Sequence, residues 1–151
     1  MLCHRICRRG HRALDGEGAR LYGGRWNSPG VPVVYTSSTI ALAALEYLVH
    51  LDQAEAPRDL VATRLDLPDD LAIATVATES LPTRWYRYPA PVACRKAGDA
   101  WLAAGKTAVL RVPSAPVPEE WNYLLNPRHQ DFHLIRRAGS RTFAFDDRLL
   151  R

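Results

Sequence analysis

A single glutamate interrupts a long apolar stretch of this chain, and its carboxylate is the group that the sequence best prepares for chemistry. Glu46 is the only charged residue in the run IALAALEYLVHL at 40–51. On a helix, apolar side chains would cover both sides of this segment, and a helix that is apolar all round is normally buried. A carboxylate held away from water is tolerated only with a partner or a task. Two interpretations stay open: Glu46 pairs structurally with an arginine or with His50, or it belongs to a functional site.

Three further residues with chemical potential lie near apolar segments. Arg25 lies in GGRWNSPG, and Tyr35 ends the segment VPVVY. Only a very short connection separates Tyr35 from the helix that carries Glu46, so their side chains can meet in one site. Ser114 follows the apolar segment AVLRVP, but no G-x-S-x-G pattern surrounds it, and a nucleophile elbow is therefore not supported.

The first part of the chain predicts a strand, a loop, a strand and a helix. Arg5 lies on one face of a first strand at 3–7, and the polar, glycine-rich residues that follow predict a long loop up to the Arg25 motif. Pro29-Gly30 fits a type II turn. A strand is expected at 32–36, and the Glu46 helix then begins after an N-cap at Ser37, Ser38 or Thr39.

The second part of the chain predicts mainly strands. An ordered loop is expected at 81–92, where Trp85, Tyr86 or Tyr88 would pack against the body, and a helix at 94–104 would end at Gly105. Further strands are expected at 60–67, 71–76, 108–112, 131–135 and 142–147, and a short helix at 119–127. Strands outnumber helices and no repeat is present, which predicts an α+β fold in a single domain, 1–151.

Composition places the chain among globular proteins with a basic excess. Apolar content is 47%, charged content is 24% and the net charge is +4, which suits an anionic small molecule, a nucleic acid or an acidic partner. Only two of the 20 basic residues are lysines. No apolar run reaches the ~20 residues of a membrane span, and the three cysteines form no disulfide framework. We therefore expect a reduced, cytoplasmic protein without membrane contact.

Two motifs resemble known sites but lack an essential part. Cys3, His4, Cys7 and His11 are close in sequence, but they do not have the paired spacing of a zinc finger. The segment AAGKT at 103–107 resembles the end of a P-loop, yet the first glycine of that pattern is missing and a helix would precede it instead of a strand. We expect neither a metal site nor a P-loop.

Several motifs, taken in order, resemble the RES domain family. They are GGRWNSPG, VVYTSS, LAALE, VLRVPS and EEWNYLLNP with His129 after it. The resemblance covers nearly the whole chain, from HRI at 4–6 to the closing FDDRL. The family is named for arginine, glutamate and serine residues, which here would be Arg25, Glu46 and Ser114.

The resemblance implies a fold like that of ADP-ribosyltransferases and an activity on NAD. RES proteins are typically toxins of type II toxin–antitoxin pairs and are neutralised by an Xre-type antitoxin with a DNA-binding domain. The implied reaction is cleavage of the nicotinamide–ribose bond by hydrolysis or phosphorolysis, or transfer of ADP-ribose to a protein. NAD is then a substrate, no metal is needed, and a homodimer within the toxin–antitoxin assembly is a further expectation. Direct nucleic-acid binding is not expected.

The resemblance also suggests a role for each candidate residue. Nicotinamide is already a cationic leaving group, so a single carboxylate, Glu46, suffices to stabilise an oxocarbenium-like ribose. Arg25 would contact the pyrophosphate or hold Glu46, and Tyr35 would stack on the nicotinamide or the ribose. Ser114 would hydrogen-bond the nicotinamide amide, the ribose or Glu46, without acting as a nucleophile. Further candidates for contacts to NAD, each of which also suits a structural hydrogen bond, are Arg5, Tyr22, Asn27, Asn122, Asn126 and His129.

Two other classes of function compete with this hypothesis. A non-enzymatic basic module could bind nucleic acid or a regulator, with Glu46 in a structural role. The sequence offers no recognition-helix pattern and no aromatic stacking platform for it. Cleavage of RNA would require paired histidines or a histidine with a basic partner, and the five histidines are scattered.

Overall fold

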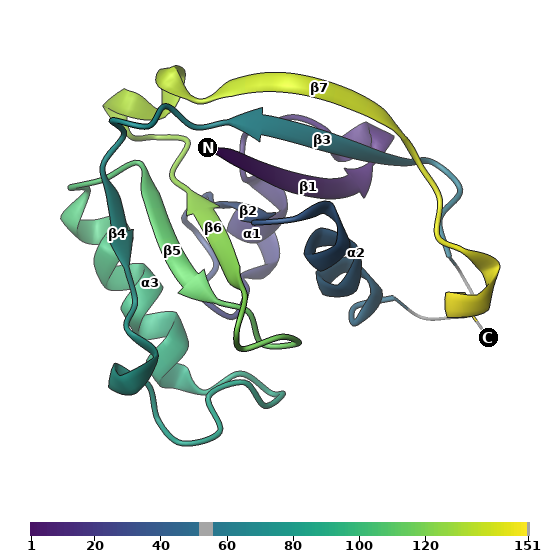
Figure 1. Cartoon of the computed structure of the whole chain (residues 1–151). Helices are drawn as coiled ribbons and strands as arrows, with labels where there is room; N and C mark the ends of the chain where they lie inside the picture. The colour runs from purple at the N-terminus through teal and green to yellow at the C-terminus, as the bar shows by residue number, and fades with distance from the viewer. Residues whose placement is uncertain (52–55, 151) are drawn as a thin grey trace.

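One mixed, seven-stranded sheet organises the protein. The computed structural model describes residues 1–51 and 56–150 (Figure 1). The strands follow the order β4-β5-β6-β2-β1-β3-β7. β4 and β5 run parallel to each other, and every other neighbouring pair is antiparallel. The prediction of an α+β fold is therefore confirmed.

The elements are short and separated by ordered connections. The strands are β1 (Leu2–Arg8), β2 (Val34–Ser37), β3 (Leu60–Asp66), β4 (Ile73–Thr75), β5 (Val109–Pro113), β6 (Trp121–Leu125) and β7 (Arg136–Phe143). The α-helices are α1 (Glu17–Tyr22), α2 (Ile40–Leu48) and α3 (Val92–Ala104). The 3-10 helices are η1 (Arg9–His11), η3 (Thr78–Ser80), η4 (Gln130–Leu134) and η5 (Asp147–Leu150). In the described residues, no helix is long and apolar enough to cross a membrane.

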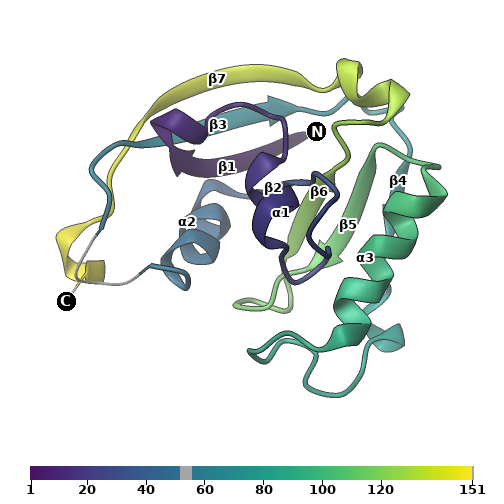
Figure 2. The same cartoon turned by 180° about the vertical axis from the view of Figure 1, so that it is seen from behind.

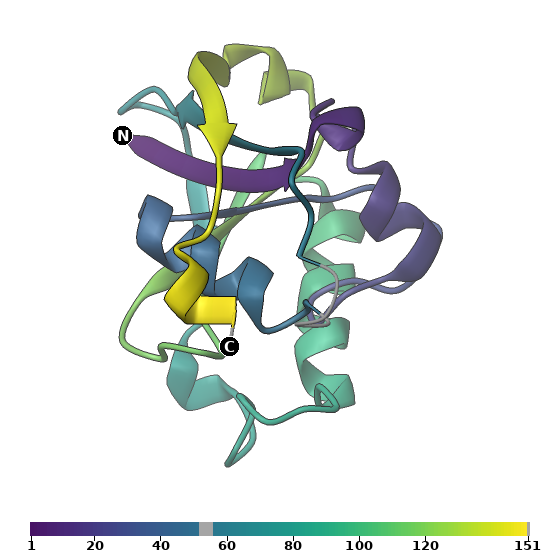
Figure 3. The same ribbon diagram turned by 90° about the vertical axis from the view of Figure 1, so that its right-hand side faces the viewer.

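The sheet has two halves, and each supports one of the longer helices. β1, β3 and β7 run across the direction of β4, β5 and β6, with α2 below the first half (Figure 1) and α3 along the second (Figure 2). Seen from the side, β2 lies between β1 and the second half of the sheet (Figure 3). Apolar side chains of α2 pack around Ile6, and those of α3 pack around Trp26 and Leu124. β2 joins the two halves, because it pairs with β6 on one side and with β1 on the other.

The helix that carries Glu46 is only partly covered. The hydroxyl of Thr39 accepts a hydrogen bond from the Leu42 backbone N–H (3.0 Å), which confirms the N-cap among the three predicted candidates. Leu42 is buried, but Leu45 and Val49 are 41% and 59% exposed. The prediction that α2 is buried on all sides is therefore wrong, because the sheet covers one face of the helix and leaves the other open.

Four local predictions are wrong where tertiary pairing or local hydrogen bonds decide the conformation. Residues 119–127 do not form a helix, because β6 lies between β5 and β2 and pairs with both. Residues 131–134 belong to η4, and Ile135 is its C-cap. The strand expected at 142–147 lies earlier in the chain, as β7. The loop predicted after β1 contains α1, where the Glu17 carboxylate accepts hydrogen bonds from Arg20. Sheet neighbours supply partners that no local pattern encodes.

The loop before β2 packs directly against α3. Asp99 of α3 accepts hydrogen bonds from the Ser28 backbone N–H (2.8 Å) and from its hydroxyl (2.6 Å). One position away, Gly98 approaches the backbone of Trp26 so closely that an added Cβ would overlap the Trp26 carbonyl oxygen. The glycine therefore sets the distance between α3 and the loop that carries Arg25.

We predict that Gly98→Ala lowers the free energy of unfolding by about 1–3 kcal/mol, because the new methyl group has no room against rigid backbone. Gly18→Ala is the matched control, since a Cβ at Gly18 of α1 meets no atom within 4 Å; it should be neutral or slightly stabilising. Urea unfolding of both variants checks this. Equal stabilities of the two variants would contradict the close approach.

Candidate functional site

The carboxylate of Glu46 lies where α2 meets the hairpin of β5 and β6. Its Oε1 atom accepts a hydrogen bond from the hydroxyl of Ser114 (2.8 Å) and a short one from the side-chain amide of Asn122. Glu46 is half-buried, and within the described residues its Oε2 atom has no hydrogen-bond partner. One oxygen is thus held by the protein, and the other is available to a ligand.

Both donors to Glu46 are themselves held by the sheet. Asn122 pairs with Ser37 across β6 and β2, and the Ser37 hydroxyl donates to the Asn122 Oδ1 atom (2.7 Å). This bond turns the Asn122 amide N–H₂ toward Glu46. The backbone N–H of Ser114 donates to the Glu120 carbonyl (2.9 Å), which closes the hairpin. Sheet geometry therefore fixes the direction from which Glu46 receives its hydrogen bonds.

Tyr35 is held by a buried asparagine. Its hydroxyl donates to the Oδ1 atom of Asn27 (2.7 Å) and accepts from the Trp26 backbone N–H (3.2 Å). Asn27 is fully buried, and its N–H₂ group donates to the carbonyls of Ala19 (2.9 Å) and Ser28 (3.0 Å). Asn27 therefore has the position and partners of a structural residue that orients Tyr35.

The surroundings of Tyr35 raise its pKa well above the usual range. Burial is the largest cause, and the Trp26 N–H opposes it. The negative charges of Asp99 and Glu46 raise the pKa further, whereas the Arg25 guanidinium lowers it. Tyr35 is thus a neutral phenol that lies within the electrostatic reach of both Glu46 and Arg25.

Arg25 binds backbone carbonyls of a loop far along the chain. Its Nη1 atom donates to the carbonyls of Trp85 (2.7 Å) and Arg87 (3.1 Å), and its Nη2 atom donates to that of Tyr86 (3.4 Å). In the part of the chain that the structure describes, none of its hydrogen bonds goes to Glu46. The expectation that Arg25 holds Glu46 is therefore not met here, and Arg25 orders the 85–87 loop instead.

The other candidate residues lie away from Glu46. Arg5 points to the face of β1 opposite to the one that packs on α2, and its guanidinium donates to the Ala13 carbonyl (2.9 Å). Tyr22 is 84% exposed at the end of α1. Asn126 and His129 follow the end of β6, and Asn126 lies about 13 Å along the chain from Asn122 at a strand's rise per residue. The structure does not bring these four together with Glu46.

Two hollows in the surface of the described residues lie apart from Glu46. One, of about 280 Å³, lies beside the start of α2, and the other, of about 430 Å³, is bordered by Asn126 and His129. Neither is lined by Glu46. Over residues 1–51 and 56–150, no group of three or more His, Cys, Asp or Glu side chains is arranged to hold a metal ion.

A family model decides the relationship of this chain to known proteins. The model described as the RES domain matches residues 2–146. The chain belongs to the RES domain family. Curated relatives of this RES domain include the "Prs ADP-ribosylating toxin" of Sphingobium sp. (strain YBL2), 42% identical over 91% of this chain and 87% of the relative. A "Toxin Res" of Yersinia enterocolitica is 37% identical over 99% of both chains.

A solved structure has the same fold as this RES domain. The crystal structure of the M. tuberculosis MbcT–MbcA toxin–antitoxin complex contains a chain that matches with a TM-score of 0.78 and 20% sequence identity. The match covers 94% of this chain and 83% of the other. At this identity the likeness concerns the fold.

Sequence reasoning missed two residues of the RES domain's site. The sequence presents Ser37 only as a candidate helix cap, but its hydroxyl orients Asn122. Asp99 was not singled out, although it ties α3 to Ser28 in the loop that carries Arg25. The available signal for Asp99 was that it is the only acidic residue in the predicted helix at 94–104. No local signal pointed to Ser37, because its partner lies 85 residues away.

We predict that Tyr35→Phe destabilises the protein by about 1–2 kcal/mol at neutral pH, because Asn27 loses its donor in a buried site. The folded protein holds the proton of Tyr35 more tightly than the unfolded chain does, because the pKa of Tyr35 is raised on folding. The contribution of the protonated phenol to the free energy of unfolding is therefore fully present below the ordinary pKa of about 10 and is lost as the pH rises further. The stability difference between the wild-type protein and the variant should therefore shrink above about pH 10.

Urea unfolding at about pH 7 and about pH 11 checks this prediction. Tyr88→Phe is the control, because Tyr88 is 85% exposed. Removal of its hydroxyl should leave the free energy of unfolding unchanged at both pH values. A difference for Tyr35→Phe that stays constant across this range would contradict the raised pKa.

Proposed function

We propose that this RES domain is an NAD-consuming toxin of a toxin–antitoxin pair, and that it cleaves the nicotinamide–ribose bond. The arrangement of Glu46 carries the proposal: Ser114 and Asn122 hold one carboxylate oxygen and leave the other for a ligand. Positive charge develops on the ribose as nicotinamide departs. A carboxylate that is already oriented stabilises this charge without reorganising during the reaction.

Ser114 and Asn122 act in this proposal as positioning residues. Each donates to Oε1 of Glu46, so they fix the orientation of the carboxylate and leave the lone pairs of Oε2 for a ligand. The Ser114 hydroxyl also accepts from the Val117 backbone N–H (3.3 Å). With this geometry the Ser114 hydroxyl is a hydrogen-bond donor to the carboxylate, and our proposal gives it no role as a nucleophile.

Tyr35 and Arg25 form the other side of the proposed site. A neutral, half-buried phenol offers its ring face to a nicotinamide or a ribose and excludes water. Arg25 orders the loop of Trp85, Tyr86 and Arg87, and in our proposal this loop encloses the dinucleotide. The proposal also includes a direct contact with the pyrophosphate, made by the N–H groups of Arg25 that do not bind these carbonyls.

The names of the relatives support a toxin that uses NAD. One relative is named an ADP-ribosylating toxin, and others are named Toxin Res. ADP-ribosyl transfer to a protein is therefore the second candidate reaction at the same carboxylate. The solved relative of the same fold is part of a toxin–antitoxin complex, which supports a cytoplasmic antitoxin partner; we expect the Xre type with a DNA-binding domain.

Product identification tests the reaction. The purified protein is incubated with NAD in phosphate buffer and in phosphate-free buffer, and the products are identified by mass spectrometry. Hydrolysis gives ADP-ribose in both buffers, whereas phosphorolysis gives a phosphorylated product in phosphate alone. A mass increase on an added protein acceptor indicates transfer. NAD that stays intact under all three conditions would overturn the proposal.

We predict that Glu46→Gln lowers kcat for NAD by at least about a hundredfold, because the amide cannot stabilise a developing cation as a carboxylate does. The glutamine can still accept both hydrogen bonds, so the thermal midpoint should stay close to that of the wild-type protein. Glu119→Gln removes one charge from an exposed site nearby and should leave kcat unchanged. Retained turnover in Glu46→Gln would remove Glu46 from the mechanism.

Ser114→Ala should lower kcat by about tenfold while KM for NAD changes little, since the hydroxyl orients Glu46 and Asn122 remains as a second donor. Steady-state kinetics at several NAD concentrations separate the two parameters. The control is Ser80→Ala, whose hydroxyl binds the Ala77 carbonyl in η3. An effect on KM alone would instead indicate a direct contact of Ser114 with NAD.

A further inference from the structure

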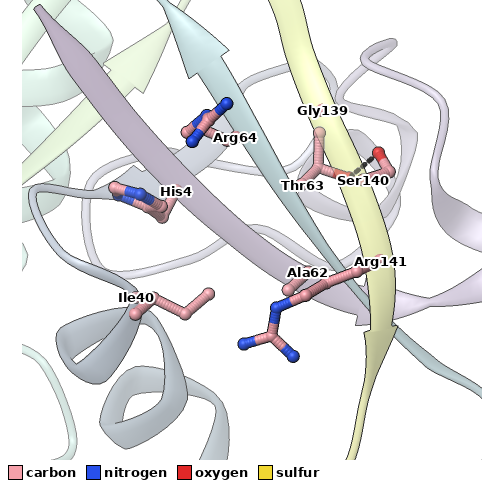
Figure 4. A pocket seen from close by; sticks show the side chains of 8 residues that line it. All are labelled: His4, Ile40, Ala62, Thr63, Arg64, Gly139, Ser140 and Arg141. Atoms are coloured by element: carbon pink, nitrogen blue, oxygen red, sulfur yellow. Dashed lines mark hydrogen bonds between the residues drawn. The ribbon is translucent and has the colours of Figure 1, made fainter.

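A groove lies on the face of β1, β3 and β7 that also packs against α2. It has a volume of about 280 Å³. Figure 4 shows the side chains around it, with Ile40 of α2 on the lower side. The lining residues are His4, Ile40, Ala62, Thr63, Arg64, Gly139, Ser140 and Arg141.

The groove exists because small residues alternate with long ones across three strands. His4, Arg64 and Gly139 form one row across β1, β3 and β7, and Ala62 lies opposite Arg141 in the next row. Residues directly opposite each other in a ladder project to the same side of the sheet. Glycine and alanine therefore leave a hollow between an imidazole and two guanidinium groups.

The two arginines of the groove keep most of their donors free. Among the described residues, Arg64 donates only to the Ala138 carbonyl (3.4 Å) and Arg141 only to the Thr142 carbonyl (3.2 Å). The lining contains no carboxylate. Two residues further along β3, Asp66 pairs with the N-terminal amine (3.6 Å). The groove thus concentrates positive charge that no described acidic side chain neutralises.

His4 contributes a buried polar atom without a partner. Its Nδ1 atom is inaccessible to water and makes no hydrogen bond within the described residues. Because Nδ1 is closed to solvent, a ligand in the groove would meet the other ring nitrogen, Nε2, which carries the proton in one of the two neutral tautomers. The imidazole nitrogen and the two guanidinium groups together suit an anion with several oxygen atoms.

Strand pairing and hydrogen bonds connect the groove to Glu46. His4 pairs with Ser37 across β1 and β2, and Ser37 hydrogen-bonds Asn122, which donates to Glu46. α2 contributes its first residue, Ile40, to the groove and carries Glu46 in its last turn. A ligand in the groove and a ligand at Glu46 would therefore contact the same helix and adjacent strands.

We propose that the groove of His4, Arg64 and Arg141 binds a phosphate group. Guanidinium groups match phosphate oxygens with paired hydrogen bonds, and three donors from three strands surround the ligand. The phosphate has two sources: the pyrophosphate of the NAD bound at Glu46, or a second, phosphate-bearing molecule. Binding in the groove does not depend on the proposed function, whereas the choice between the two sources rests on it.

Titration calorimetry with inorganic pyrophosphate at low ionic strength tests the groove. Arg64→Met and Arg141→Met should each weaken binding by about tenfold or more. Both side chains are exposed, so the variants should keep the wild-type thermal midpoint. Equal dissociation constants for the wild-type protein and both variants, or no binding to the wild-type protein, would overturn the proposal.

Arg137→Met is the matched control for charge and strand. Arg137 also lies on β7, but its register partner is Leu65, whose side chain packs in the core with Cys3, and its guanidinium donates to the Arg12 carbonyl (3.0 Å). It therefore faces away from the groove. This variant should bind pyrophosphate within about twofold of the wild-type protein; a loss equal to that of Arg64→Met would indicate general charge attraction and overturn the site.

Competition with ADP-ribose distinguishes the two sources. If saturating ADP-ribose abolishes pyrophosphate binding, and Arg64→Met raises KM for NAD without changing kcat, the groove holds the pyrophosphate of NAD. If pyrophosphate binds equally well beside ADP-ribose, the groove holds a second ligand. Both results support the binding of phosphate in the groove. A wild-type protein that binds pyrophosphate but leaves NAD intact would overturn the proposed function alone.

Discussion

The hydrogen bonds from the β5–β6 hairpin to Glu46 are the constraint on which the site depends. Glu46 lies in the last turn of α2, where the negative end of the helix dipole does not favour an anion. The hydroxyl of Ser114 and the amide of Asn122 offset this by binding the same oxygen. The carboxylate is thus fixed by donors from another element, and its free oxygen has a defined direction.

A second set of polar contacts joins segments that are far apart in the sequence. Asn27 is fully buried and holds the hydroxyl of Tyr35, while Asp99 holds the neighbouring Ser28 from α3. Arg25 extends the same loop to the carbonyls of residues 85–87. Because each contact satisfies buried or half-buried polar groups, displacement of one segment would leave several others unpaired. The wall of the site is therefore held as a unit.

The distribution of charge over the sheet agrees with anionic ligands. The groove of His4, Arg64 and Arg141 is bordered by Ile40 at the start of α2, and Glu46 lies in the last turn of the same helix. A dinucleotide requires a negative group beside its ribose and positive groups beside its pyrophosphate. The two features can thus serve one ligand or two.

Much of the fold follows from local sequence patterns. β1, β3, β5, the β2–α2 unit with its Thr39 cap, and α3 with Gly105 at its end all lie within a few residues of where periodicity and capping place them. The segment at 119–127 is the clearest failure. Its short apolar run is compatible with a helix or a strand, and only pairing with β5 and β2 makes it a strand. That pairing is also what presents Asn122 to Glu46.

By itself, the sequence identified Glu46 as a carboxylate in an otherwise apolar helix. It also placed Arg25, Tyr35 and Ser114 in motifs of the RES domain. Only the tertiary structure decided which of these side chains meet. It brought Ser114 and Asn122 to Glu46, directed Arg25 to the 85–87 loop, and turned Arg5 to the face of β1 that α2 does not cover. The physical reason is that hydrogen bonds between residues 60 to 85 positions apart depend on strand order and register, which no local pattern encodes.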